Sequence, residues 1–163
     1  MKTFELKNIF LGDLSTKAAS EIAFSDKVLK KVHGEGSHIT PWKDNHRNIK
    51  YKMNIPDAPS IMKRFLVGDH IDVNITQIMK TCNENRYDVE SQVKLNCIGS
   101  RLIKIQPSFS IERNSTTSET FFNAKVNVSV RAFPPINHIA ENFMIIQAEQ
   151  DILGYAKNIL ENI

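Results

Sequence analysis

Five histidines are the side chains in this sequence best suited to bind a metal or to exchange protons. They stand at positions 33, 38, 46, 70 and 138. A zinc site built on a helix needs two ligands about one turn apart, as in H-x-x-x-H or H-E-x-x-H, and neither spacing occurs here. We therefore expect no metal site and assign the histidines to turns and surfaces.

Motifs for a nucleophile or for a phosphate-bearing cofactor are also missing from the sequence. There is no G-x-S-x-G elbow. The segment Gly34-Glu35-Gly36 offers G-x-G without the third glycine and without a predicted helix after it. The sequence thus predicts no catalytic residue and no cofactor.

Two cysteines, Cys82 and Cys97, remain to be placed. A turn at residues 83–86 would put Cys82 near Tyr87 across a hairpin and leave Cys97 far along the ladder, beyond the reach of a disulfide. Because we expect reduced thiols, and because no secretory h-region is present, the predicted location is cytoplasmic.

Length and composition limit the remaining possibilities. The chain has 163 residues, 41% of them hydrophobic, which fits one domain over residues 1–163. Apolar runs do not exceed four residues, as at 143–146, so a membrane-spanning helix is not expected. A net charge of +3 is too small to predict a nucleic-acid partner.

The order of elements is the most informative feature. Residues 4–9 alternate as a strand does, and Ser15 and Ser25 are suited to cap two short helices. From about residue 38 to 132 the apolar period is two, broken by turn signals and by an irregularity at 77–78 that suggests a bulge. Pro107 needs a bulge or a nitrogen that faces away from the ladder.

After residue 135 the period returns to 3.6 and continues to residue 163. The apolar residues of this long helix fall on two sides, one set in each half, so we expect a kink near Gln147 or contacts with different neighbours. The predicted fold class is therefore α+β of helix-grip type. A seven-stranded curved antiparallel sheet, with two short helices after its first strand, surrounds a long C-terminal helix.

One face of the predicted sheet is almost purely apolar, with Ser91 as its only hydroxyl placed by alternation. Twist and curvature separate such a sheet from a straight helix, which leaves a cavity, typically of about 300 to 1,000 Å³. The alternative is a filled core, which periodicity alone does not distinguish from a cavity.

Several segments resemble the VASt domain of the START-like superfamily. They are Phe24-Ser25-Asp26, Ile39-Thr40-Pro41-Trp42, Arg47 with Tyr51, Val73-Asn74-Ile75-Thr76-Gln77 and Ile139-Ala140-Glu141-Asn142, in order over roughly residues 4–161. The resemblance implies binding of a sterol or another hydrophobic lipid, with no catalysis. Together with the alternation, it gives the expected ligand-binding residues: Trp42, Tyr51, Met53, Ile61, Met62, Phe65, Val73, Ile75, Gln77, Val89, Ser91, Val93, Ile105, Phe109, Phe122, Val126 and Ile152.

In such domains, the loop between the third and fourth strands gates the cavity. In this sequence that loop is Pro56 to Asp69. Its apolar residues surround two cations, so we expect transient contact with a membrane surface through Lys63, Arg64, Phe65 and Leu66. The alternative is a hydrophobic cluster folded onto the sheet edge.

Two other functions stay open at this point. START-like folds also include enzymes, but alternation places Asp72, Asp88, Glu90 and Lys94 on the outer face, which argues against one. A filled core would instead favour a protein-interaction module. The sequence does not determine the oligomeric state.

Overall fold

The computed structural model describes residues 1–54, 60, 70–97 and 99–163. Within them, seven antiparallel strands form one sheet in the order β1-β7-β6-β5-β4-β3-β2. The strands are β1 (Lys2–Phe10), β2 (His38–Ile39), β3 (His46–Asn54), β4 (His70–Cys82), β5 (Arg86–Asn96), β6 (Ile103–Arg113) and β7 (Thr120–Val130). The helices are α1 (Thr16–Ala23), α2 (Asp26–His33) and α4 (Ile136–Glu161), with a 3₁₀ turn at Ser100–Leu102.

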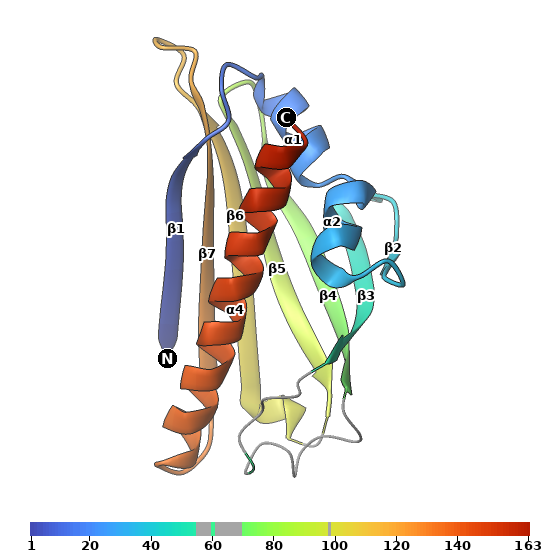
Figure 1. The fold of residues 1–163 in the computed structure, drawn as a ribbon, viewed down its shortest axis with the longest axis vertical. Helices are drawn as coiled ribbons and strands as arrows, with labels where there is room; N and C mark the ends of the chain where they lie inside the picture. The colour runs from blue at the N-terminus through green and yellow to red at the C-terminus, as the bar shows by residue number, and fades with distance from the viewer. Residues whose placement is uncertain (55–59, 61–69, 98) are drawn as a thin grey trace.

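The sheet curves around α4, and α1 and α2 lie beside the C-terminal end of that helix (Figure 1). Strands β2 to β7 follow one another as neighbours, whereas β1 pairs with β7 at the far edge. This is the predicted seven-stranded sheet with two short helices after its first strand, so the predicted fold class is confirmed.

The two predicted helix caps are present. The hydroxyl of Ser15 accepts a hydrogen bond from the backbone N–H of Ala18 at 3.1 Å, and that of Ser25 accepts one from Val28 at 3.3 Å. Each cap satisfies a backbone donor that would otherwise lack a partner in the first turn. Gly34 ends α2 at a φ of 102°, a conformation that side chains disfavour.

The structure differs from expectation at two places in the sheet. We expect a strand over residues 38–42 from the sequence, but β2 comprises only His38–Ile39, so Trp42 lies beyond it. The register shift between β4 and β5 falls between Met79 and Thr81 rather than at 77–78. The pattern breaks at Gln77 for another reason: this amide faces the interior, where it hydrogen-bonds Arg47.

Pro107 interrupts the ladder on one side of β6. The pairs between β5 and β6 run from Arg86–Glu112 to Glu90–Ser108 and resume only at Val93–Ile105. Towards β7 the pairing is continuous, with Pro107 opposite Val126. By the same register, Ser91 is the residue of β5 across from the proline, whose nitrogen carries no hydrogen to donate.

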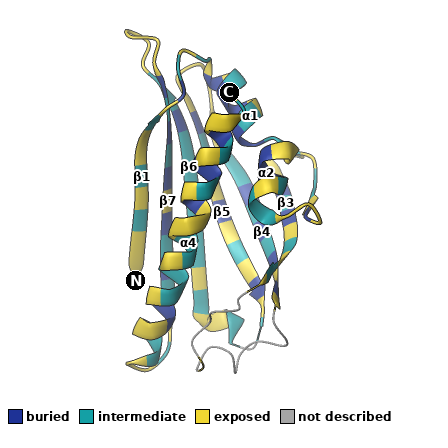
Figure 2. Cartoon of the chain, viewed as in Figure 1, coloured by how far each residue is buried: buried dark blue, intermediate teal, exposed yellow. Residues whose placement is uncertain are grey.

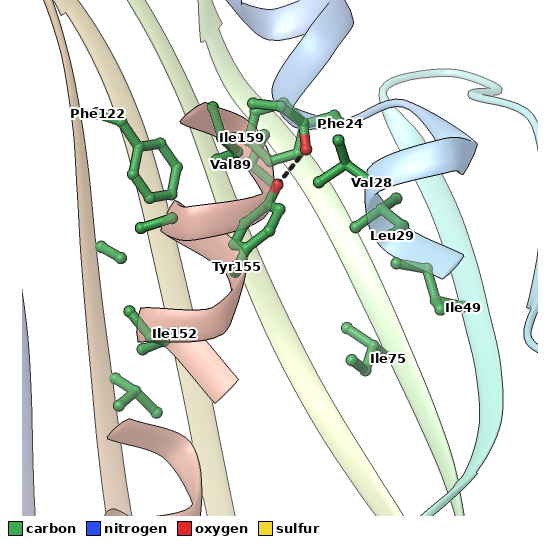
Figure 3. Packing of buried hydrophobic residues seen from close by; sticks show 14 of the residues in the cluster. Phe24, Val28, Leu29, Ile49, Ile75, Val89, Phe122, Ile152, Tyr155 and Ile159 are labelled. Carbon is green, nitrogen blue, oxygen red and sulfur yellow. Dashed lines mark hydrogen bonds between the residues drawn. The ribbon is translucent and has the colours of Figure 1, made fainter. Parts of the chain in front are cut away.

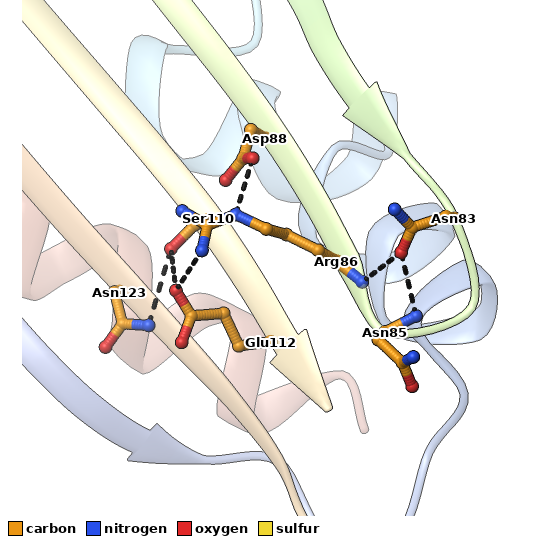
Figure 4. Close-up of polar contacts among 7 residues, drawn as sticks. All are labelled: Asn83, Asn85, Arg86, Asp88, Ser110, Glu112 and Asn123. Atoms are coloured by element: carbon orange, nitrogen blue, oxygen red, sulfur yellow. Dashed lines mark hydrogen bonds and ion pairs between the residues drawn. The ribbon is translucent and has the colours of Figure 1, made fainter. Parts of the chain in front are cut away.

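Buried and more exposed residues alternate along β5, as the period of two predicts (Figure 2). Around the β4–β5 turn, the carboxamide oxygen of Asn83 accepts hydrogen bonds from the backbone N–H groups of Asn85 and Arg86. The guanidinium of Arg86 bridges Asp88 at 2.6 Å and Glu112 at 3.2 Å (Figure 4). The side chain of Asn83 thus stabilises the turn locally. Across the hairpin, Cys82 pairs with Tyr87 as predicted.

Two side-chain hydrogen bonds join helix α4 to other described elements, one towards each end of the helix. Towards its C-terminal end, the Tyr155 hydroxyl donates a hydrogen bond to the carbonyl of Ala23 at 2.5 Å (Figure 3). The Tyr155 ring also packs edge-on against Phe109 and Phe122, with ring centroids 5.3 and 5.5 Å away. Nearer its N-terminal end, a Glu141 carboxylate oxygen accepts from the backbone N–H of Val130 at 3.0 Å.

The inward face of α4 is one continuous stripe rather than two apolar sides. Ile139 and Ile146, which belong to the apolar side of the first half, are exposed, whereas Ala140, Ile152, Ala156 and Ile159 are buried. Gln147 and Asp151 also lie on the inward stripe. The two-sided pattern arose because polar residues occupy inward positions in the middle of the helix.

We predict that Tyr155→Phe lowers the free energy of unfolding by about 1–2 kcal/mol, because the buried Ala23 carbonyl loses its donor while the ring packing stays. Urea denaturation would measure this change. Leu153→Ala on the exposed side of α4 is the control, with an expected change of about 0.5 kcal/mol or less. Equal effects of the two substitutions would contradict the assigned role of the hydroxyl.

Candidate functional site

A cavity of about 190 Å³ lies between the concave face of the sheet and helices α2 and α4. Its volume is below the range of about 300 to 1,000 Å³ that we expected for this architecture. Strands β3 to β7 supply one wall, and residues from Ile136 to Tyr155 of α4 supply another. At the end far from Tyr155, the cavity reaches Gly99, Leu102 and Ala132.

Most of the predicted ligand-binding residues of the sheet and of α4 line this cavity. They are Tyr51, Met53, Val73, Ile75, Gln77, Ser91, Val93, Ile105, Phe109, Val126 and Ile152. Val89 and Phe122 are instead fully buried in the core, and the lining does not include Trp42. Ile61, Met62, Lys63, Arg64, Phe65 and Leu66 lie outside the described residues.

The helices contribute lining residues that sequence reasoning missed. They include Leu29, Val32 and His33 of α2, and Phe143, Met144, Gln147 and Asp151 of α4. Those of α2 recur at steps of three and four residues, which would have marked the inward face of that helix. In α4 this spacing of apolar residues is interrupted, because polar residues stand at the inward positions 147 and 151.

A first polar group stands at one end of the mostly apolar cavity. The Nε of Arg47 donates to the side-chain oxygen of Gln77 at 2.7 Å, and its Nη1 donates to the carbonyl of Phe24 at 2.9 Å. In the sheet, Gln77 pairs with Arg47 on one side and with Ser91 on the other. The three residues thus form one row across β3, β4 and β5, and each is at most 4% exposed.

This row is incompletely satisfied. Within the part of the chain that the structure describes, the Nη2 of Arg47 and the Oγ of Ser91 are buried without a hydrogen-bond partner. No carboxylate of the described residues forms an ion pair with Arg47. Its guanidinium carbon instead lies 4.4 Å from the centre of the Trp42 ring, and burial lowers its pKa.

A second polar group lies where α2, β3 and α4 approach one another. The His33 ring stacks on Tyr51 with centroids 4.5 Å apart. Burial, aided by the positive charge of Arg47, lowers the pKa of His33 to about 4. The pKa of Tyr51 is raised, first by burial and then by Asp151.

Asp151 completes this second group from α4. The residue is solvent-exposed as a whole, yet it contributes to the cavity wall, and burial of its carboxylate raises its pKa to about 6. Titratable side chains therefore do reach the cavity. Alternation along the strands correctly placed Asp72 and Glu90 outside the cavity. It could not indicate His33 and Asp151, because these two side chains come from helices.

The described residues hold no cluster of three or more His, Cys, Asp or Glu that could bind a metal ion. Both cysteines are free; Cys82 is exposed, and Cys97 lines the cavity, where burial raises the pKa of its thiol. Among the described helices, none has the length and apolarity to cross a bilayer.

Solved structures with the same arrangement exist. The Mll3558 protein from Rhizobium loti is 7% identical, with a TM-score of 0.56 over 99% of this chain and 96% of its own. The TTHA0849 protein from Thermus thermophilus is 8% identical, with a TM-score of 0.58 over 98% and 94%. Ara h 8.0201, a helix-grip protein, is 10% identical, with a TM-score of 0.50 over 99% of both chains.

The chain has the helix-grip fold. These likenesses show this fold and do not single out the VASt domain. No family model matches the chain, and no curated protein matches its sequence.

The low pKa of His33 predicts how stability depends on pH. The unfolded chain takes up this proton near pH 6.5 and the folded chain only near pH 4, so stability falls as the pH drops through that interval. Asp151 acts in the opposite direction, because its pKa is raised on folding and its stabilising protonated form is lost as the pH rises towards 6.

Comparison with His33→Phe isolates the histidine, because both proteins keep Asp151 and the aromatic stack on Tyr51. Between pH 7 and 4.5, we expect the wild type to lose about 1–2 kcal/mol more stability than the variant. Urea denaturation at the two pH values would measure the difference. Parallel losses in the two proteins would show that His33 takes up its proton equally well in the folded state.

Proposed function

We propose that this protein binds a single hydrophobic lipid in the cavity and carries or senses it without catalysing a reaction. The observation that supports this function is the cavity itself, a mostly apolar space between sheet and helix with one polar row at its end. Burial of apolar surface contributes about 25 cal/mol per Å², which would keep such a ligand out of water.

The ligand class follows from the same lining. An apolar body would contact residues such as Val93, Ile105 and Phe143, and one small polar group would satisfy the row that contains Gln77 and Ser91. Sterols and single-chain lipids both have this form. The resemblance to the VASt domain favours a sterol, and the small volume favours a slender molecule.

Filling the cavity should abolish binding. We predict that Val93→Phe and Ala148→Phe, on opposite walls, each lower lipid affinity at least about tenfold, because the added ring occupies the ligand's space. Extraction of sterol and fatty acid from liposomes, followed by mass spectrometry of the protein-bound lipid, measures this loss. Leu153→Phe, on the exposed side of α4, should bind as the wild type does.

If the wild type extracts no lipid from either kind of liposome, the carrier function is wrong. If Val93→Phe and Ala148→Phe both retain the wild-type affinity, the lipid binds elsewhere on the protein. Far-ultraviolet circular dichroism on each variant checks that the fold is retained.

We further propose that the protein contacts membranes through Lys63, Arg64, Phe65 and Leu66. This proposal rests on the sequence, in which two cations stand among apolar residues. Cations near an anionic surface contribute about 1 kcal/mol each, and the apolar side chains would enter the interface.

Reversing these charges should slow lipid uptake from anionic membranes. For the double variant Lys63→Glu, Arg64→Glu, we expect an uptake rate at least about tenfold lower with phosphatidylserine vesicles and little changed with neutral vesicles. Lys17→Glu is the control, because this exposed residue lies on α1, near the C-terminal end of α4. An equal slowing with both vesicle types would contradict an electrostatic contact.

The titratable groups on the cavity wall favour a second function, that of an enzyme. Asp151 could exchange a proton near neutral pH, and His33 and Tyr51 lie on the same wall. Mass spectrometry of lipids before and after incubation would show a changed product, and Asp151→Asn should abolish its formation. Unchanged lipids would leave the carrier function as the better account.

A further inference from the structure

The polar row at the end of the cavity has an excess of hydrogen-bond donors. Arg47 is a cation with 4% of its surface exposed and without a carboxylate partner among the described residues. Its Nε donates to the side-chain oxygen of Gln77, so the amide nitrogen of Gln77 points away from Arg47. Ser91, which lines the cavity, has a hydroxyl without a partner.

A buried positive charge and unpaired donors are costly unless a ligand compensates them. Arg47 also polarises the Gln77 amide through their hydrogen bond, which strengthens the amide as a donor on its other side. The group that suits this environment best is an anionic oxygen acceptor. An amine would meet like charge, and an alcohol would leave the charge of Arg47 uncompensated.

The position of the row determines which way a ligand lies. Gln77 and Ser91 stand beside the aromatic cluster of Phe24, Phe109 and Tyr155, which packs at this end of the cavity. From there the cavity extends along apolar side chains to Leu102 and Ala132 at the opposite end. A polar group held by the row would therefore lie innermost, with the apolar body directed towards the opposite end.

We propose that Gln77 and Ser91, with Arg47 behind them, anchor a carboxylate, and that the preferred ligand is a single-chain amphipathic acid bound carboxylate-first. This inference rests on the proposed lipid-binding function and makes its ligand class specific. The volume of about 190 Å³ agrees with one alkyl chain better than with a fused-ring body. Arg47 is a positioning residue that acts through Gln77.

The experiment compares three probes with the same chain: dodecanoic acid, dodecan-1-ol and dodecylamine. Trp42 is the only tryptophan in the sequence, and its ring lies 4.4 Å from the guanidinium carbon of Arg47, so its fluorescence reports on the anchor during titration. Calorimetry gives the affinities independently. We expect the acid to bind about tenfold more tightly than the alcohol, and the amine to bind most weakly.

Two variants separate the anchor from the rest of the cavity. Ser91→Ala and Gln77→Leu should weaken acid binding about tenfold and leave alcohol binding within about twofold. Val93→Ala, a matched control on the apolar wall, should weaken acid and alcohol to the same extent. Ser91→Ala removes only an unpartnered hydroxyl, so it keeps the test decisive if Gln77→Leu does not fold.

A readout on the ligand completes the test with the wild-type protein. Burial alone would raise the pKa of a bound carboxyl above its value in water, whereas proximity to Arg47 lowers it. Titration of dodecanoic acid labelled with carbon-13 at the carboxyl, followed by NMR in the complex, should give a value of about 4 or below.

Each outcome is decisive for one of the two proposals. If the protein binds none of the three probes and extracts no lipid from liposomes, the lipid-binding function is wrong. Equal affinities for acid and alcohol, equal effects of the variants on both, or a bound carboxyl pKa above about 6 would overturn the carboxylate anchor. Lipid binding would stand in that case.

Discussion

The arrangement depends on holding a nearly straight helix over a curved sheet at two separated points. Tyr155 fixes α4 through its hydrogen bond to Ala23 and its aromatic neighbours, and Glu141 fixes it through the backbone of Val130. Between these attachments the sheet bends away from the helix axis, because twisted strands cannot follow a rod. The space that results between helix and sheet is the cavity.

Much of this architecture follows from the sequence. Period-two alternation defined the apolar face of the sheet, and the serines before α1 and α2 acted as the expected caps. Side chains on the inner face, such as Val93 and Ile105, line the cavity because alternate residues of a strand must point the same way.

Other features could not be obtained from the pattern, because they depend on pairs of residues far apart in the chain. Gln77 breaks the alternation of β4 because its amide faces inward. The partner that makes this orientation favourable, Arg47, is thirty positions away in the chain. Asp151 faces the cavity because α4 presents one side to it along its length, whatever the polarity of single residues. The volume depends on how far α4 stands from the sheet, which no local pattern encodes.

The missing β5–β6 pairs beside Pro107 affect how easily the cavity wall can open. Where β5 and β6 lack the pairs at residues 91–92 and 106–107, fewer hydrogen bonds resist separation of the two strands. These missing pairs lie in the cavity wall beside Ser91, so the wall would widen most easily there if the proposed ligand were bound. Widening of the wall is therefore expected between β5 and β6 before it is expected at either hydrogen-bonded end of α4.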